Sequence, residues 1–521
     1  MSDSRYDCIV IGAGHNGLTC AAYLARAGRS VLVLEAGESV GGAARTREFA
    51  PGFHVSACAH LLHLMPPSLA RELALPRHGL RMAAERMPTV ALAPAGEVLR
   101  IDAEAGRSPR ELSSSDADSY LRYHARLQRL ARALRPILES APPRLGTTDW
   151  RDRLALLRLA ARVRLLGRTD MRELLRIGGM CVQDLLDEHF ESELLKGALA
   201  LDAVLGTNSG PRSPGTVFTL LYRMAAGGAA GDSLSQPTGG LGSLCDALAR
   251  AAGEAGAAIR REAPVKRVLV RDDRAVGVTL ESGEHLEAAC VISSADPRTT
   301  FLGLLGAEHL DAGFVRRLAH LRTQGMAAKL HLALDRAPSF RGLGPQAPAG
   351  RLVLAPSLAA IERAFSHAKY EEFSAAPVLE IVLPTVADPA LAPPGKHVLS
   401  AVVQYAPYRL ASGWESGRQR FLDVILATLE THAPGLRESV LAAELLTPAD
   451  IEAQFRISGG HWHHTELALD QFFMVRPLAG AAQYRAPVAG LYLCGAGCHP
   501  GGGVMGIAGR NAARQILREA A

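Results

Sequence analysis

The sequence predicts an α/β protein, with a Rossmann-type dinucleotide-binding domain and a discontinuous α+β second domain made of a mixed sheet plus helices. A glycine turn lies between two short apolar runs at the start of the chain, and another follows an apolar run near its end. Strand-like alternation in the second half predicts a further sheet. A chain of 521 residues is too long for one core, so we expect two or more domains.

The first element pair is a strand at 6–11 and a helix at 18–28 that is stopped by Gly28. A second buried strand follows at 30–35 and ends in Glu35, 23 positions after Gly12. Together these segments form a complete β-loop-α-β unit around a G-x-G-x-x-G pattern, which makes the pattern far stronger evidence than it is alone.

Each residue of this unit has an expected role toward a dinucleotide. Gly12 permits the tight turn, Gly14 lets the backbone approach a pyrophosphate, and Gly17 allows close packing of helix and strand. The phosphates would lie at the helix N-terminus. The Glu35 carboxylate would accept hydrogen bonds from ribose hydroxyls, which disfavours a 2′-phosphate and hence NADP. Neighbouring contacts are expected from Ala13, Asn16 and Ala36.

The remaining elements alternate between the two expected domains. Helical, proline-interrupted sequence runs from about 66 to 230, and 239–270 reads as a glycine turn, a helix and a strand. A β-meander follows at 275–296, and strands of a second sheet are expected at 326–335 and 378–405. A strand with a glycine turn (490–497) and a helix (508–520) close the chain. The dinucleotide-binding domain is predicted at 1–75, 235–300 and 485–521, and the substrate domain, with its helical insert, at 76–234 and 301–484.

Composition and cysteine spacing exclude several classes of protein. The net charge is +5, and acidic and basic residues are interspersed, which argues against nucleic-acid binding. The N-terminus does not resemble a secretory signal, and no run of about 18 apolar residues would span a bilayer. Eight cysteines are scattered without a C-x-x-C pair or a zinc-type spacing, so we expect a cytoplasmic protein with free thiols and no metal site.

A second glycine pair identifies the dinucleotide. Gly41 and Gly42 are followed by Arg45 and Thr46. This resembles the G-G-x-x-R-[ST] extension of the FAD-linked amine oxidase and desaturase superfamily, and the resemblance implies non-covalent FAD, with Gly42, Arg45 and Thr46 reaching the pyrophosphate and flavin. A disulfide reductase would carry two cysteines near this point, whereas only Cys58 is present.

The resemblance to phytoene-desaturase-like flavoproteins extends along nearly the whole chain. It implies that the strand around Val265 meets the adenine side of FAD. The stretch "GAGCHPGGGVMG" (495–506) resembles the family's terminal flavin motif. The literal G-x-G-x-x-G at 501–506 is therefore accidental, since only 15 residues follow it and no second strand can form. The implied flavin contacts here are Gly495, Gly497, Gly503, Val504 and Met505, the last two opening a helix.

Two histidine-bearing stretches are candidates for the active site. Segments 379–408 and 459–477 are most similar to one branch of the family, which usually shows Phe-His-Gly where this chain has His463, His464 and Thr465. His464 and His60 are the preferred catalytic bases, because histidine titrates near neutral pH. The alternative is that each is a core or surface histidine. Asp470 and Arg476 are interpreted as structural. The other polar residues of these stretches are His54, His63, His461 and Glu466.

The resemblance implies an FAD-dependent oxidoreductase that removes hydride from a C–H or C–N bond of an apolar small molecule, by desaturation or dehydrogenation. No second complete Rossmann unit is found for NAD(P)H, so electrons would pass to oxygen, a quinone or a partner protein. Oxidation of a small amine or alcohol, and a non-catalytic FAD-binding scaffold, remain alternatives. The Arg- and Leu-rich helix at 151–168 could contact a membrane peripherally or pack on its own domain. The sequence carries no signal of oligomeric state.

Overall fold

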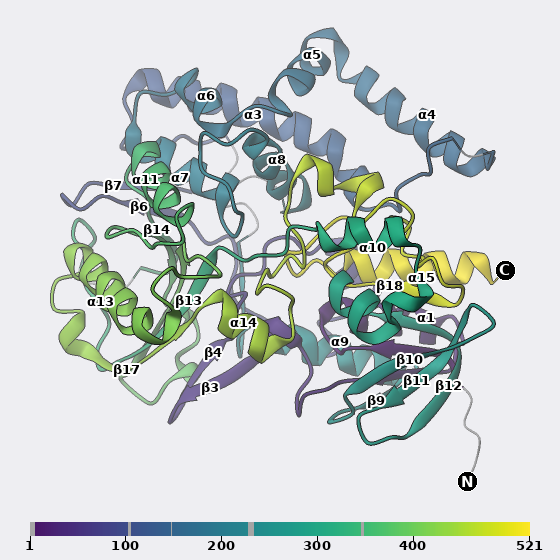
Figure 1. Cartoon of the computed structure of the whole chain (residues 1–521). Helices are drawn as coiled ribbons and strands as arrows, with labels where there is room; N and C mark the ends of the chain where they lie inside the picture. Colours follow the sequence, from purple (N-terminus) through teal and green to yellow (C-terminus); the bar gives the residue numbers. More distant parts are fainter. Residues whose placement is uncertain (1–5, 103–105, 147, 228–233, 345–347, 521) are drawn as a thin grey trace.

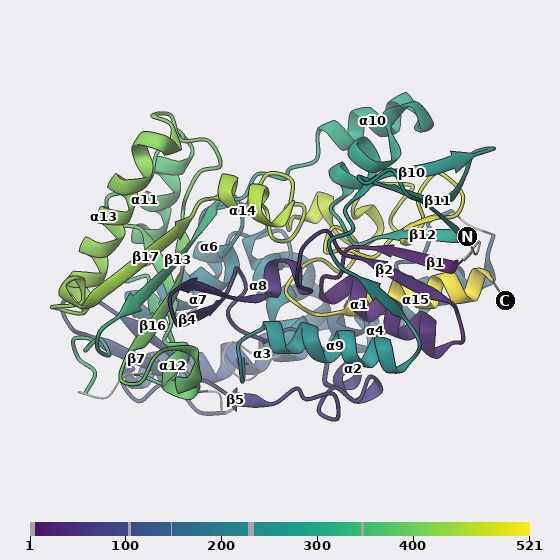
Figure 2. The same cartoon turned by 90° about the horizontal axis from the view of Figure 1, so that it is seen from below.

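A parallel sheet assembled from both ends of the chain carries the glycine turns. The computed structural model describes residues 6–102, 106–146, 148–227, 234–344 and 348–520. Figure 1 shows this first sheet at the lower right, a second sheet at the left and a layer of helices along the top. Figure 2 shows the two sheets side by side from below.

The first sheet has seven strands in the order β10-β11-β12-β1-β2-β9, with β18 paired to β12. Its parallel strands are β18 (Leu491–Leu493), β12 (His285–Ser293), β1 (Tyr6–Ile11), β2 (Val31–Leu34) and β9 (Ala258–Arg260). Apolar runs form the largely buried β1, β2 and β18, whereas β9 is a mostly exposed strand at the edge of the sheet. β10 (Val265–Arg271) and β11 (Arg274–Leu280) extend β12 as an antiparallel meander. The predicted Rossmann-type architecture is therefore confirmed.

Three helices pack together on this sheet. α1 (His15–Arg26) contacts both α9 (Gly242–Glu254) and α15 (Ile507–Glu519). α1 begins at His15 rather than at the predicted residue 18, because Gly14 is its N-cap. α2 (Pro67–Glu72) and α10 (Ala312–Ala319) are short helices.

The second sheet also has seven strands, in the order β17-β13-β16-β15-β14-β6-β7. The predicted strands within 326–335 and 378–405 are confirmed as β13 (Ala327–Leu334), β15 (Val378–Val382) and β16 (His397–Gln404). α13 (Trp414–His432) packs on the second sheet, with Phe421 and Ile425 in one apolar cluster with the leucines of the sheet. The other elements are β17 (Val440–Leu446), β14 (Arg351–Leu354), α11 (Leu358–Ala368), α12 (Pro384–Ala387) and α14 (Pro448–Phe455).

The helical layer is less uniform than the sequence predicts. Within the stretch expected to be helical, β5 (Met82–Ala84), β6 (Thr89–Leu92) and β7 (Val98–Ile101) are strands. β6 pairs in parallel with β14, a contact distant in sequence that local periodicity does not reveal. The helices are α3 (Ser114–Leu138), α4 (Trp150–Leu165), α5 (Gly167–Ile177), α6 (Val182–Asp187), α7 (Glu193–Val204) and α8 (Thr216–Gly227).

Two small ribbons complete the fold. β3 (Thr46–Ala50) pairs with β4 (Phe53–Ser56), and β5 pairs with β8 (Gln236–Pro237). The strands of the first sheet come from residues 6–34, 258–293 and 491–493. The exact domain boundaries given above stay a prediction.

Candidate functional site

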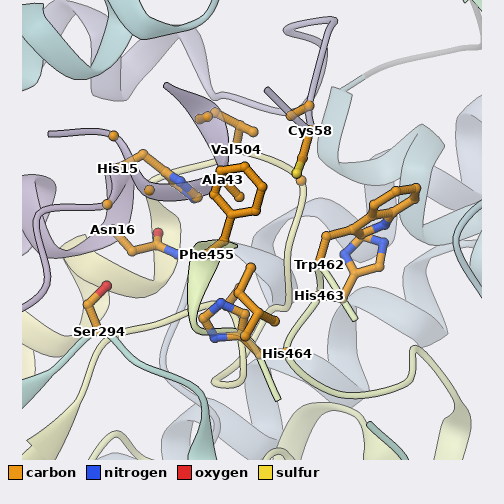
Figure 3. Close-up of a pocket in the computed structure, with 18 of the residues that line it drawn as sticks. His15, Asn16, Ala43, Cys58, Ser294, Phe455, Trp462, His463, His464 and Val504 are labelled. Atoms are coloured by element: carbon orange, nitrogen blue, oxygen red, sulfur yellow. The ribbon is translucent and has the colours of Figure 1, made fainter. Parts of the chain in front are cut away.

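A cavity of about 300 Å³ lies where the two sheets and the helical layer meet. Its wall combines the glycine turns of the first sheet with residues of the 57–64 segment, α8, the second sheet and the 455–467 segment. Figure 3 shows His15, Asn16, Phe455 and His464 gathered around one space, with Cys58, Trp462 and His463 alongside. Segments far apart in the sequence therefore form one site.

The first turn has the shape that an anion-binding helix N-terminus requires. Gly12 has a φ of +93°, and a Cβ at Gly17 would lie 2.1 Å from the carbonyl oxygen of Gly12. Gly14 cannot cap α1 with a side chain, and no acidic residue lies in the first turn. The first-turn N–H groups of α1 thus face the cavity without a capping group, which fits a pyrophosphate.

Glu35 holds this turn in place. Its carboxylate accepts hydrogen bonds from the backbone N–H of Ala13 (2.7 Å) and of Gly37 (2.9 Å). Glu35 and Ala36 both line the cavity at the end of β2. The structure therefore gives Glu35 a role in holding the loop. Its predicted contact with the ribose remains a prediction.

The second glycine pair lies directly against the first turn. The N–H of Gly41 donates to the carbonyl of Ala13 (2.9 Å), and Gly42 lines the cavity. The guanidinium of Arg45 lies over the Phe455 ring, 5.2 Å from its centroid, and its buried Nε has no hydrogen-bond partner among the described residues. An unpartnered buried guanidinium nitrogen fits the anionic cofactor that the motif implies.

Thr46 has a different position. Its hydroxyl donates to the Gly239 carbonyl (2.8 Å) and accepts from the N–H of Gly242 (3.0 Å). Thr46 therefore joins β3 to the start of α9 and does not line the cavity.

The terminal glycine turn approaches the same cavity from the other side. A Cβ at Gly495 would lie 2.4 Å from the Ser294 carbonyl, and one at Gly497 would lie 2.5 Å from Pro297, so both glycines permit close packing. Gly503 and Val504 line the cavity. Val504 and Met505 do not open the helix, because α15 begins at Ile507 after the left-handed Gly506.

The structure thus brings together most, but not all, of the predicted cofactor contacts. Those that line the cavity are Gly12, Gly14, Asn16, Glu35, Ala36, Gly42, Val265, Gly503 and Val504. Those that do not line it are Ala13, Gly17, Arg45, Thr46, Gly495, Gly497 and Met505. One cavity receives both glycine motifs, as expected of a single dinucleotide.

His60 lines the cavity and is held at both ring nitrogens. The Lys329 ammonium lies 2.6 Å from Nδ1, and Nε2 lies 2.9 Å from a Glu380 oxygen. This arrangement assigns the ring proton to Nε2, which then donates to Glu380. Burial, together with the charge of Lys329, lowers the pKa of His60 to about 4.

A chain of buried charges continues from His60. Glu380 accepts a hydrogen bond from Arg351, and Arg351 also donates to Asp202 (2.6 Å). Although burial alone would raise it, Arg351 and His60 hold the pKa of Glu380 well below its usual range. Burial lowers the pKa of Lys329 to about 7, so its charge changes near neutral pH.

His464 and His15 occupy the flavin-motif side of the cavity. His464 has a φ of +64°, and its Nδ1 has no hydrogen-bond partner among the described residues. Burial lowers the pKa of His464 to about 4. The pKa of His15 is also lowered to about 4, first by burial and then by repulsion from His464 when that ring is protonated. Both rings are therefore neutral at pH 7.

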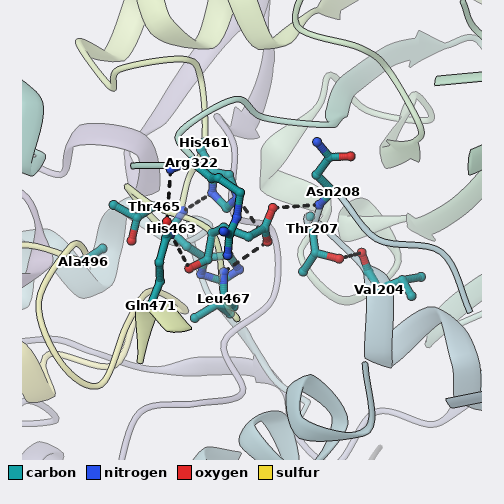
Figure 4. A network of polar contacts seen from close by, with 12 residues as sticks. Val204, Thr207, Asn208, Arg322, His461, His463, Thr465, Leu467, Gln471 and Ala496 are labelled. Atoms are coloured by element: carbon teal, nitrogen blue, oxygen red, sulfur yellow. Dashed lines mark hydrogen bonds and ion pairs between the residues drawn. The ribbon is translucent and has the colours of Figure 1, made fainter. Parts of the chain in front are cut away.

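Arg476 holds the histidine segment against the terminal glycine turn. Fully buried, it donates to the carbonyls of His463 (2.7 Å) and Ala496 (3.0 Å), among others. Glu466 accepts from the N–H of Asn208 (2.9 Å) and does not line the cavity. Figure 4 shows polar contacts around Asn208, His461, His463 and Gln471, and the Arg476 hydrogen bonds fix the backbone on both sides of His464.

Three site residues were missed in the sequence. His15 lines the cavity but occupies a variable position of the glycine motif, for which the sequence predicts only a loop. Lys329 and Glu380 lie on β13 and β15, strands that are buried at every position. A charged residue inside an apolar strand is the sequence feature that could have identified Lys329 and Glu380, because such groups are buried only when they are paired.

Cys58 is the cysteine that lines the cavity. All eight cysteines are free thiols, and burial raises the pKa of Cys58 to about 12. The described part of the chain holds no cluster of three or more His, Cys, Asp or Glu side chains suited to a metal ion. Within that same part, each helix is too short or too polar to cross a membrane.

Comparisons with known proteins agree with this geometry. The family model described as "Flavin containing amine oxidoreductase" matches residues 17–517. The mouse "Pyridine nucleotide-disulfide oxidoreductase domain-containing protein 2" is 39% identical over 549 residues, covering 99% of this chain and 94% of the mouse protein. "Phytoene dehydrogenase" from Streptomyces griseus is 28% identical over 538 residues, covering 98% and 94%. Putrescine oxidase bound to putrescine is similar in fold, with a TM-score of 0.64, 18% identity and 99% coverage of both chains.

Proposed function

Because this chain belongs to the flavin-containing amine oxidoreductases and is an FAD-dependent oxidoreductase, we propose that it removes hydride from an apolar organic substrate. The bond attacked would be a C–H bond, or a C–N bond, and the product a desaturated or dehydrogenated compound. The observation that carries this proposal is the cavity, whose glycine turns lead into a wall rich in leucine, valine and aromatic side chains.

Non-covalent FAD would be held by both glycine motifs. The free N–H groups at the start of α1 would bind the pyrophosphate, and Glu35 the ribose hydroxyls. Gly503 and Val504 would border the flavin. When bound, FAD supplies the capacity to accept two electrons as a hydride.

The substrate side of the cavity favours an apolar molecule over an amine. Leu61, Leu64, Leu205 and Val402 line it. Of the acidic side chains in the described wall, Glu35 accepts backbone hydrogen bonds, and Glu380 is occupied by His60 and Arg351. No carboxylate in this described wall is thus left over to pair with a substrate ammonium.

We assign the role of proton acceptor to His464. Its ring is neutral at pH 7 and offers an unpartnered Nδ1. His60 is the second candidate, but both of its ring nitrogens already have partners, so a proton would have to move through Lys329 or Glu380. Arg476 keeps the His464 backbone in position.

Electrons would leave the enzyme to oxygen, a quinone or a partner protein. The described residues form one Rossmann-type sheet, and its glycine turns serve the FAD cavity. An enzyme of this kind would differ from the reductases that bind NAD(P)H at a second dinucleotide site.

The decisive experiment is anaerobic mixing of the FAD-loaded enzyme with matched long-chain olefins, alcohols and amines, followed by admission of air. We expect the flavin absorbance to bleach with an apolar substrate and to return in air or with a quinone. Bleaching by short amines alone would favour an amine oxidase. Failure of all three classes to bleach the flavin would favour a non-catalytic scaffold.

We further propose that α4 and α5 contact an anionic membrane surface. α4 has a single buried residue, Asp152, so it is not packed along a face on its own domain. Large apolar side chains are exposed along the two helices, beside many arginines: Trp150, Leu157, Leu165 and Leu175. The location consistent with this proposal and with free thiols is cytoplasmic and peripheral to the membrane.

Flotation with liposomes tests this surface. Wild-type protein should float with vesicles containing phosphatidylserine at low salt and stay below with phosphatidylcholine alone. Exchange of both Leu157 and Leu165 for serine should abolish flotation, whereas Leu441→Ser, on the distant β17, should not. Retention of flotation by the double variant would rule out the contact.

A further inference from the structure

One partly buried cation in the cavity wall is not used by the proposed reaction. Arg223, on α8, lines the cavity, and 16% of its side chain remains exposed. Arg456 is the other arginine in the described wall, but 61% of its side chain is exposed and it pairs with Glu281 (3.8 Å). Arg223 therefore supplies positive charge to a part of the wall that also holds Glu380 and the buried His63 and His463.

The protein neutralises Arg223 only partly. Its Nη2 lies 3.3 Å from Asp202 Oδ1, whereas Nη2 of Arg351 lies 2.6 Å from the same oxygen. Charge-assisted hydrogen bonds between such groups are usually about 2.7–2.9 Å long. Asp202 therefore forms its stronger ion pair with Arg351 and a weaker one with Arg223.

The other acid of this chain of contacts does not fully neutralise Arg223. Glu380, the second acid of the chain, is occupied by Arg351 and His60. The described chain of contacts therefore sets two guanidinium groups, Arg351 and Arg223, against two acids, Asp202 and Glu380, and it carries an excess positive charge whenever Lys329 is protonated. An anion entering the cavity would supply the missing negative charge in a low-dielectric setting, where it is worth most.

A guanidinium selects among anions by shape. Its planar fork of N–H donors matches the two oxygens of a carboxylate. The same positive charge repels an ammonium group, and the leucines of the wall favour an alkyl or terpenoid body. The complementary ligand is therefore an apolar molecule that carries one carboxylate.

We propose that Arg223 binds a carboxylate of the substrate and so positions an apolar carboxylic acid, rather than a neutral hydrocarbon or an amine, in the cavity. This inference rests on the proposed function, since it names the class of molecule that the same site would oxidise. Arg223 acts here as a specificity-determining residue.

The test is a binding titration of the FAD-loaded, oxidised enzyme with dodecanoate, dodecanol and dodecylamine, below their micellar concentrations. Perturbation of the visible flavin spectrum reports binding in the cavity, and binding elsewhere on the surface does not change it. Wild-type enzyme should bind dodecanoate most tightly. Arg223→Met should weaken dodecanoate binding about 10- to 100-fold and leave dodecanol binding nearly unchanged.

Two further variants secure the interpretation. Arg223→Lys should restore part of the preference because it keeps the charge. Arg437→Met, at an exposed arginine in the turn before β17 that does not line the cavity, should behave as wild type. Equal binding of dodecanoate and dodecanol by the wild-type enzyme would overturn the inference without any variant. A preference that persists in both Arg223 variants would overturn it as well. Because no turnover is measured, failure of dodecanoate to bleach the flavin would count against the proposed reaction and not against this binding site.

Discussion

His464 combines a neutral ring with an unusual backbone. A positive φ is uncommon for a residue with a side chain, and such residues concentrate at functional sites. The Arg476 hydrogen bonds to the neighbouring carbonyls keep the segment in this conformation. The ring is thus placed by the backbone, and the acceptor atom Nδ1 has no hydrogen-bond partner within the described part of the chain.

Removal of the His464 ring should slow the chemical step. We expect His464→Asn to lower the rate of anaerobic flavin reduction about 100-fold or more, since a positioned base contributes on that order. Asparagine tolerates the left-handed backbone, so the fold should persist. Stopped-flow absorbance measures the rate, and His54→Asn, in β4 and outside the cavity wall, is the control. An unchanged single-turnover rate would remove His464 from the mechanism.

At the scale of elements, the contact of α1 with α15 sets the geometry of the phosphate-binding turn. A Cβ at Gly509 would lie 2.1 Å from the Asn16 carbonyl oxygen, so the helices touch backbone to backbone. Asn16 is in the first turn of α1 and lines the cavity. The last helix of the chain therefore supports the first nucleotide-binding loop, a link that neither motif shows alone.

Two matched glycine substitutions test this contact. Gly509→Ala should destabilise the protein by about 1–3 kcal/mol and weaken FAD binding, because overpacking pushes α15 off α1. Gly253→Ala, in α9, has open space around its added methyl group and should be neutral or stabilise by up to about 1 kcal/mol. Thermal unfolding and FAD titration measure both effects. Equal stability of the two variants would contradict the close packing.

At the scale of the whole molecule, the buried histidines make stability depend on pH. Burial, alone or as the largest cause, lowers the folded-state pKa of ten described histidines below the ordinary value of 6.5, and five of these show the clearest values. The lowered values are about 4 or about 3, for His15, His60, His63, His464 and His499. The unfolded chain therefore takes up protons below pH 6.5, while the folded chain does not until near pH 4.

The free energy of unfolding should consequently fall as the pH drops from about 6.5 toward 4, with each histidine contributing about 1.4 kcal/mol per pH unit. Urea titrations at about pH 7, 6 and 5 measure the slope. His499→Gln, whose amide can still donate to the Ile137 carbonyl, should reduce that slope by one histidine's share. A flat profile between pH 7 and 5 would show that these rings are protonated in the folded state.

The sequence by itself determined the local units and the cofactor. The spacing of Gly12, Gly14 and Gly17 between two apolar strands depends on backbone geometry that neighbouring residues dictate, so it predicted the turn, the helix and the FAD family resemblance. The limits of the helical stretch were less well predicted, because β6 and β7 are strands only through pairing with a distant partner.

Only the tertiary structure decided which side chains share the cavity. Lys329, Glu380 and Arg223 lie on β13, β15 and α8, and their contacts join residues up to 320 positions apart, as between Glu380 and His60. It also placed His15 in the cavity wall and left Thr46 and Met505 out of it. The physical reason is that periodicity tells which face of an element is buried, whereas the partner buried against it depends on how the two sheets and the helices pack.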